Sequence, residues 1–158
     1  MEPTLAQIKG IWHKTIDAEG GHCVVCERWG KTYKHEITRS RVRALMWLCS
    51  APSDADGWLD VPNTAPRWLV RTNSMSTLKF WGLIERKPME RGSKTKHSGM
   101  WRPTQLGQDF AYGLASVPKE VYTYNDSLRG ISSAMVKVTD CFDSVFDYQE
   151  TMNSVLKG

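Results

Sequence analysis

The sequence predicts a mixed α+β fold, built as one compact body with small appendages. The chain has 158 residues, of which 41% are apolar and 24% charged, and this composition is typical of a globular protein that buries a core. Several segments repeat apolar residues at helical spacing. Other, shorter segments are rich in β-branched and aromatic residues and are joined in pairs by turn-forming residues. The same composition excludes a chain that is disordered throughout.

The first fifty residues predict two helices, one before and one after a compact extended segment. Residues 2 to 18 carry apolar side chains at helical spacing, and a glycine pair ends this helix. Residues 22 to 36 predict a tight loop, or knuckle, followed by a short extended piece. Thr38 is suited to cap a second helix that runs to about Ser50 with its apolar face turned inward.

The middle of the chain predicts two further helices. Residues 57 to 62 are expected to be extended, because they end before a proline. Asn63 or Thr64 then caps a helix that has Pro66 in its first turn. A second helix covers residues 74 to 81, and its buried face is expected to consist of Met75, Leu78 and Trp81.

Two hairpins are predicted in the second half. Residues 83 to 87 and 99 to 103 form the first, joined by a long basic loop. Thr104 caps the helix that follows and that runs to about Leu114. The second hairpin has its turn at Asn125-Asp126 between the apolar runs 121–124 and 128–131. An acidic helical stretch follows over residues 140 to 156, with an inward face expected to contain Phe142, Val145 and Phe146.

The net charge of +4 is unevenly distributed. Residues 37 to 102 contain twelve Lys or Arg against five Asp or Glu, whereas residues 1 to 36 are neutral and residues 103 to 158 are acidic. A basic middle segment predicts one positive face, as nucleic-acid-binding proteins have, and the alternative is the solvated face of an ordinary domain. The sequence has neither a bilayer-spanning apolar run nor the features of a signal peptide, so we expect a cytoplasmic protein with no membrane partner.

The predicted order of helices and strands between residues 38 and 114 resembles that of a winged-helix domain. The segment LKFWGLIER (78–86) looks like the end of a recognition helix that runs into the first wing strand, and MWRPTQLGQDF (100–110) is similar to the returning strand and the next helix. Pro103 departs from this pattern, because it leaves one ladder position without a donor. The whole layout, with C-x-x-C before this segment and VPKEVYTYND after it, also resembles small uncharacterised proteins of bacteriophages and prophages.

The resemblance implies a division of the chain and a mode of binding. Residues 37–115 would form a winged-helix domain of three helices and a β-hairpin wing, 1–36 an N-terminal helix and zinc knuckle, and 116–158 a C-terminal β-hairpin and helix extension.

The recognition helix would enter the major groove of duplex DNA and the wing would follow the backbone. Helix contacts would be Asn73, Ser74, Ser76, Thr77 and Lys79. Wing contacts would be Arg91, Lys94, Lys96 and His97. Phosphate contacts would be Arg67, Arg71 and some of Arg39, Arg41 and Arg43. The tryptophans of this domain are expected to pack in its core: Trp47, Trp68, Trp81 and Trp101.

A C-x-x-C pair suggests a structural zinc ion. Cys23 and Cys26 would bring two thiolates to one tetrahedral ion, and the candidates for the remaining ligands are His35, His22 and His13. Two readings compete with this one. The two cysteines can be reduced and packed as small apolar residues, or they can form a redox pair.

Catalysis has little support in the sequence. It contains no phosphate-binding loop, dinucleotide fingerprint, zinc-protease motif or nucleophile elbow. The knuckle pairing and the acidic partners of a metal-dependent nuclease are also missing. We therefore expect a non-enzymatic, sequence-preferring duplex-DNA-binding protein of phage type, a transcriptional regulator in the host cytoplasm. Its acidic C-terminal piece would serve dimerisation or partner docking. The alternative is a phage-encoded protein-interaction module that binds and modulates a host protein without binding DNA.

Overall fold

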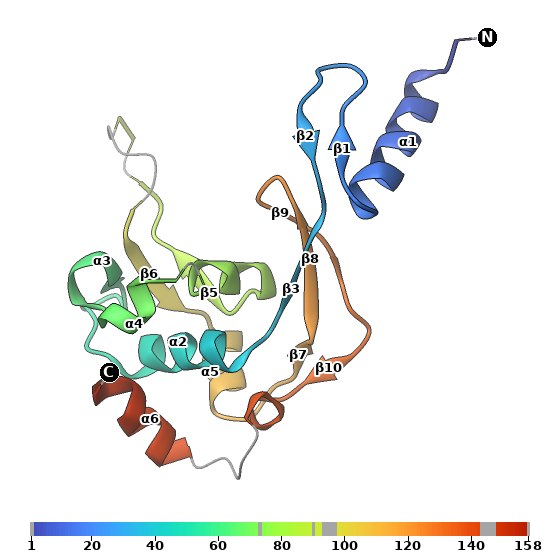
Figure 1. Cartoon of the computed structure of the whole chain (residues 1–158). Coiled ribbons are helices and arrows are strands. Elements are labelled where there is room, and N and C mark those ends of the chain that lie inside the picture. The colour runs from blue at the N-terminus through green and yellow to red at the C-terminus, as the bar shows by residue number, and fades with distance from the viewer. Residues whose placement is uncertain (1, 73, 90, 93–97, 143–147, 158) are drawn as a thin grey trace.

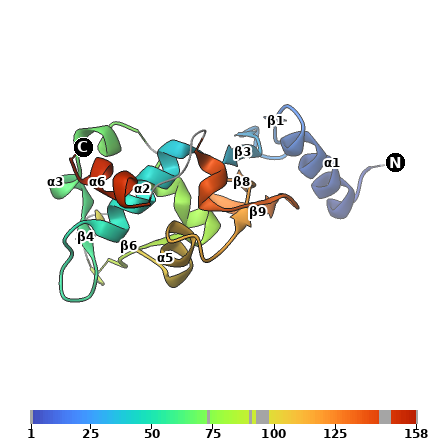
Figure 2. The same ribbon diagram turned by 90° about the horizontal axis from the view of Figure 1, so that it is seen from below.

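The computed structural model describes residues 2–72, 74–89, 91–92, 98–142 and 148–157, and it has the predicted α+β fold. Within these ranges the strands form four small antiparallel sheets. Figures 1 and 2 show helices and one sheet gathered at one end of the molecule, a second sheet in the middle, and an arm that carries the N-terminus at the other end.

The body is built around helix α2 (Arg39–Ser50). Its N-cap is Thr38, as predicted, because the threonine side chain accepts the N–H of Arg41. One face of α2 is fully buried. Helices α5 (Gln105–Ala111) and α6 (Tyr148–Lys157) pack against it, and Figure 2 shows α6 lying across α2. The C-terminal helix is therefore part of the body.

A three-stranded sheet and short helices complete this end of the molecule. Their order along the chain is β4 (Leu59–Asp60), α3 (Val61–Thr64), α4 (Arg67–Val70), the 3-10 helix η1 (Ser76–Trp81), β5 (Ile84–Arg86) and β6 (Met100–Pro103). The strand order in the sheet is β4-β6-β5, so the returning strand of the hairpin lies in the centre.

Two elements of this region differ from the sequence prediction. The single helix expected to be capped by Asn63 or Thr64 is two one-turn helices, and both predicted caps are wrong. Helix α3 has Asp60 at its N-cap and includes Val61 and Pro62, which were expected to be extended. Helix α4 has Pro66 at its N-cap, where its extended backbone separates the two helices. The helix expected over residues 74 to 81 is a 3-10 helix that begins at Ser76. Its predicted inner face is confirmed, since three residues are buried as expected: Met75, Leu78 and Trp81.

The middle sheet has the strand order β3-β8-β9, formed by β3 (Tyr33–Glu36), β8 (Glu120–Tyr124) and β9 (Ser127–Ile131). The predicted turn joins β8 to β9, with Asn125 and Asp126 both at positive φ. Strand β3 pairs along its whole length with β8. The sequence prediction had placed these two segments in different regions of the chain, 1–36 and 116–158. Short strands β7 (Val117–Pro118) and β10 (Met135–Val136) pair beside this sheet, and the 3-10 helix η2 (Val138–Cys141) follows.

The N-terminal arm consists of helix α1 (Leu5–Asp17) and the hairpin β1 (Gly21–His22) and β2 (Trp29–Gly30). Thr4 and Gln7 form a capping box at the start of α1. At its other end, the carboxylate of Asp17 accepts two hydrogen bonds from Arg129 of β9, at 2.7 and 2.8 Å. This ion pair joins the arm to the middle sheet.

One hydrophobic core runs through the body. The prediction for the four tryptophans is confirmed: Trp47, Trp81 and Trp101 are buried, and Trp68 packs against the core while partly buried. The inward face predicted for the acidic stretch is confirmed in part, because Phe142 packs against the core, whereas Val145 and Phe146 lie outside the described residues. Among the helices that the structure describes, none has both the length and the apolar character to cross a bilayer.

Candidate functional site

The polar side chains of η1 are engaged within the chain. The hydroxyl of Thr77 donates to the carbonyl of Ser74 at 2.7 Å and accepts the Nε–H of Arg41 at 2.9 Å. Lys79 lies 3.0 Å from a carboxylate oxygen of Asp126, in the β8–β9 turn. Thr77 and Lys79 therefore fasten η1 to helix α2 and to the middle sheet. Ser74 and Ser76 are half-buried, and Asn73 lies outside the described residues.

A cleft of about 420 Å³ lies beside the start of η1. Helices α3 and α4 form one wall, and strands β5 and β6 form the other. Ser76 lines this cleft, and so does Arg86, whose guanidinium lies 4.2 Å from the centre of the Trp101 ring. The buried Nε of Arg86 has no hydrogen-bond partner among the described residues.

Four of the predicted phosphate and wing contacts are exposed, and the first of them, Arg39, lies at the start of α2. Arg67 lies on α4, Arg71 just after it, and Arg91 in the β5–β6 loop. Figure 1 shows α4 beside the hairpin sheet. The arginines of α2 are held differently, because Arg39 and Arg43 stack over Phe142 and Trp68, at 5.4 and 4.8 Å from the ring centres. Lys94, Lys96 and His97 lie outside the described residues.

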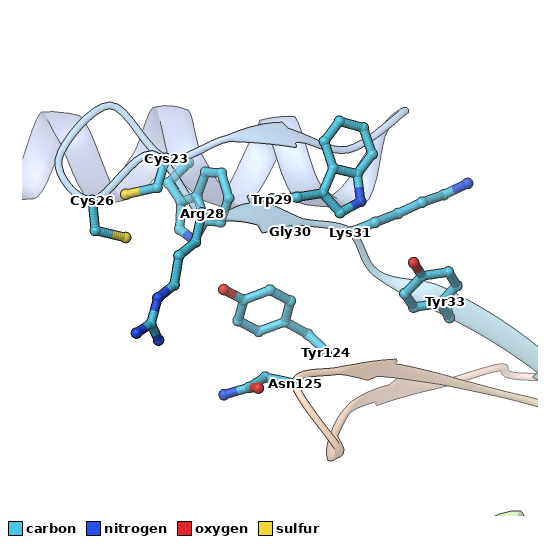
Figure 3. Close-up of a pocket in the computed structure, with 10 residues that line it drawn as sticks. Cys23, Cys26, Arg28, Trp29, Gly30, Lys31, Tyr33, Tyr124 and Asn125 are labelled. Atoms are coloured by element: carbon cyan, nitrogen blue, oxygen red, sulfur yellow. The ribbon is translucent and has the colours of Figure 1, made fainter.

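The cysteine loop is a tight turn between β1 and β2. The N–H of Cys23 donates to the carbonyl of Arg28 at 2.9 Å, and the N–H of Glu27 donates back to Cys23 at 2.8 Å. Glu27 has a positive φ of 61°, which closes the turn. The Sγ of Cys23 accepts backbone N–H groups of Cys26 and Val25, and these bonds hold the pKa of the thiol below its usual range. Figure 3 shows the two sulfur atoms close together.

The histidines proposed as zinc ligands do not join the cysteines. His35 lies on β3, where its Nε2 is 3.0 Å from the Thr123 hydroxyl and its ring stacks on Phe80. His22 uses its Nδ1 to bond the carbonyl of Glu27, and His13 is exposed on α1. Among the residues that the structure describes, no three His, Cys, Asp or Glu side chains converge on a common point. The chain thus offers two thiols here, without the complete ligand set expected from the sequence.

The cysteine loop also borders a second cleft, of about 400 Å³, that the sequence did not single out. Its described lining is aromatic, cationic and thiol-bearing, with no Asp or Glu: Trp12, Cys23, Cys26, Arg28, Trp29, Gly30, Lys31, Tyr33, Tyr124 and Asn125. In Figure 3 the ends of the Arg28, Tyr124 and Asn125 side chains are directed toward the same opening. We call it the aromatic cleft.

Packing beneath the aromatic cleft requires a glycine. Trp12 and Tyr124 meet edge to face, with ring centroids 6.3 Å apart at an interplanar angle of 76°. A Cβ at Gly30 would lie 2.5 Å from the Trp12 ring, so only glycine lets the two rings close over β2. One signal was visible in the sequence, since RWGKTYK (28–34) alternates basic and aromatic residues. Trp12 and Tyr124 come from segments far from it along the chain.

Comparisons of this chain with protein families, with curated proteins and with solved structures give no match.

Proposed function

We propose that the chain is a non-enzymatic duplex-DNA-binding protein that uses a winged helix of residues 37–115. The observation that carries the proposal is topological. Helix, strand, two short helices, a 3-10 helix and a hairpin follow one another, and the first strand pairs with the returning strand of the hairpin in the order β4-β6-β5. This order resembles that of a winged-helix domain, with η1 in the position of the recognition helix and the β5–β6 loop in that of the wing.

The exposed arginines support phosphate contact as the main source of affinity. Arg67, Arg71 and Arg91 flank the hairpin sheet, and a guanidinium binds phosphate oxygens through several donors at once. Thr77 and Lys79 act as positioning residues in this proposal, because their polar groups hold η1 in place. Base contacts would come from Ser76 and from Arg86 at the wing root, which line the cleft beside η1.

Fluorescence anisotropy with mixed-sequence duplex DNA over a series of salt concentrations tests the proposal. Each phosphate contact adds about 0.9 to the slope of log K against log salt, so Arg67→Ala with Arg71→Ala is expected to make the slope shallower by about two. The matched control is Lys9→Ala with Lys14→Ala, which removes two charges from helix α1 and leaves the slope unchanged. Absence of binding at low salt, or equal slopes for both double variants, refutes the proposal.

A zinc ion at the cysteine loop is a second proposal, favoured by the geometry of the turn. Two thiols lie three residues apart in a closed loop, and backbone N–H groups already stabilise the thiolate of Cys23. Titration of the reduced chain with Co²⁺ tests it through thiolate-to-cobalt absorption. Cys23→Ser with Cys26→Ser is expected to abolish this absorption. Cys49→Ala keeps it, because burial raises the pKa of that thiol to about 12. Absorption that persists without Cys23 and Cys26 contradicts the proposal.

A protein-interaction role is the competing function, and exposed aliphatic side chains favour it. Val24 and Val25 at the tip of the cysteine loop are 75% and 72% exposed, and Leu5 and Ile11 on α1 are 64% and 58% exposed. Exposed apolar side chains that join into a contiguous patch are typical of surfaces that bind a partner. A chain with wild-type folding and no affinity for DNA at low salt would shift the assignment to this role.

A further inference from the structure

We propose that the aromatic cleft binds a short stretch of single-stranded nucleic acid, and that it does so independently of the duplex-binding face. Figures 1 and 2 place the arm that carries β1 and β2 at the opposite end of the molecule from α3 and α4. The two surfaces therefore do not overlap, and each can be altered without the other.

The rings of the cleft provide stacking surfaces for unpaired bases. Tyr33 is 51% exposed on β3, so a base can reach its ring. Trp12 and Tyr124 form the inner wall through their edge-to-face contact. Stacking of bases on aromatic side chains is the general mode by which proteins hold single strands, because every base has a π face.

The charges at the cleft complement a phosphodiester backbone. Arg28 is exposed, Lys31 is half-buried, and neither makes an ion pair with any carboxylate that the structure describes. The Lys31 ammonium lies 5.8 Å from the centre of the Tyr33 ring, so a phosphate and a stacked base would be held next to each other.

Two carboxylates near the cleft are paired with other groups. Asp126 pairs with Lys79 at 3.0 Å, and Asp17 pairs with Arg129 and accepts the hydroxyl of Thr32. The described lining itself contains two cations and no carboxylate, so its own side chains carry a positive charge. A basic, ring-lined cavity without carboxylates selects an unpaired strand, because the bases of a duplex are stacked on each other and cannot reach the rings.

The test uses the full chain and a fluorescein-labelled oligothymidylate of about ten nucleotides. It is made in the Arg67→Ala, Arg71→Ala background, which weakens phosphate contact at the duplex face, so that its outcome is separate from that of the duplex proposal. Tyr33→Leu is expected to weaken binding roughly tenfold or more, whereas Tyr33→Phe, which keeps the ring, binds as the parent does. Binding is also expected to quench tryptophan fluorescence, because Trp12 lines the cleft.

A charge series gives a second, independent readout. Arg28→Ala with Lys31→Ala is expected to make the salt slope shallower by about 1.4, since each contact to a single strand contributes about 0.7. Lys9→Ala with Lys14→Ala is the control of equal charge and leaves the slope unchanged. Equal affinity of the Tyr33→Leu and Tyr33→Phe variants overturns the proposal. So does competition by duplex DNA, or by thymidine monophosphate, at the affinity of the oligonucleotide.

Discussion

At the scale of single residues, His35 shows how the surroundings of a side chain decide its charge. The imidazole is partly buried between β8 and η1, where it bonds Thr123 and stacks on Phe80. Burial, together with the positive charge of Arg41, lowers the pKa of His35 below its usual range. The folded chain therefore holds this histidine neutral, in the form that packs on an aromatic ring.

A pH-dependent loss of stability follows from this histidine. Below about pH 6.5 the unfolded imidazole takes up a proton that the folded one excludes, so the free energy of unfolding decreases as pH falls. For one proton the slope cannot exceed about 1.4 kcal/mol per pH unit. Urea unfolding of the wild type and of His35→Gln at pH 7.5, 6.5 and 5.5 measures it. The wild type is expected to lose more stability than the variant as pH falls. Equal losses in the two proteins would contradict the assignment of this pH dependence to His35.

At the scale of elements, one ion pair joins helix α1 to strand β9. Hydrogen bonds from Arg129 and from Thr32 lower the pKa of Asp17 to about 2. The stabilisation is present above pH 4, where the unfolded carboxyl is also ionised, and is lost as pH falls toward 2. The side chain of Asp17 is 48% exposed, so solvent screening limits the contribution to about 1 kcal/mol or less.

The corresponding variant is Asp17→Asn. It is expected to be less stable than the wild type at pH 7 by up to about 1 kcal/mol, with the difference vanishing near pH 2. Chemical unfolding at pH 7, 4 and 2.5 checks this, and Glu19→Gln, which neutralises a nearby exposed carboxylate, serves as the control. A difference that stays constant down to pH 2.5 would show that the carboxylate's charge is not its source.

The elements also show which parts of the fold local sequence can predict. Caps and turns depend on neighbouring residues, so Thr38, Thr104 and the Asn125-Asp126 turn were all predicted correctly. The division of one predicted helix follows from Pro66 itself, which the prediction placed inside the first turn instead of before it. The 3-10 form of η1 depends on how a short segment packs, which periodicity does not encode. Pairing of β3 with β8 was not predictable, because four extended residues fit many partners.

The candidate site was predicted less well than the fold, for the same reason. Basic residues can be recognised in the sequence by their type. The partners of Thr77 and Lys79 cannot, because these partners are Arg41 and Asp126, which lie far away along the chain. The zinc ligand set failed to assemble among the described residues because the β3 ladder carries His35 onto Thr123. Sequence spacing could not reveal the direction of that strand.

At the scale of the whole molecule, the core does not respect the boundaries expected from the sequence. It includes four valines beyond residue 115, each almost completely buried: Val117, Val121, Val138 and Val155. The indole N–H of Trp81 also donates to the carbonyl of Pro118 at 2.8 Å. Residues 37–115 therefore rely on the C-terminal part of the chain to cover their core.

A fragment of residues 37–115 is expected to be far less stable than the full chain. Burying a valine contributes at least about 1.5 kcal/mol, so losing four removes about 6 kcal/mol, comparable to the total stability of many domains. Circular dichroism during thermal unfolding compares the fragment with the full chain at equal concentration. A fragment that melts cooperatively at the temperature of the full chain would establish 37–115 as an autonomous domain.

The ladder between β3 and β8 has a consequence for the newly synthesised protein. His35 and its hydrogen-bond partner Thr123 are separated by 88 residues, which a ribosome takes roughly 4 to 18 seconds to add. During that interval strand β3 has no partner strand. The cysteine loop and helix α1 have already been synthesised, but the middle sheet that they contact has not yet formed. Long-range pairing of this kind delays folding until its second partner emerges. The β3–β8 ladder therefore cannot form before strand β8 has been synthesised.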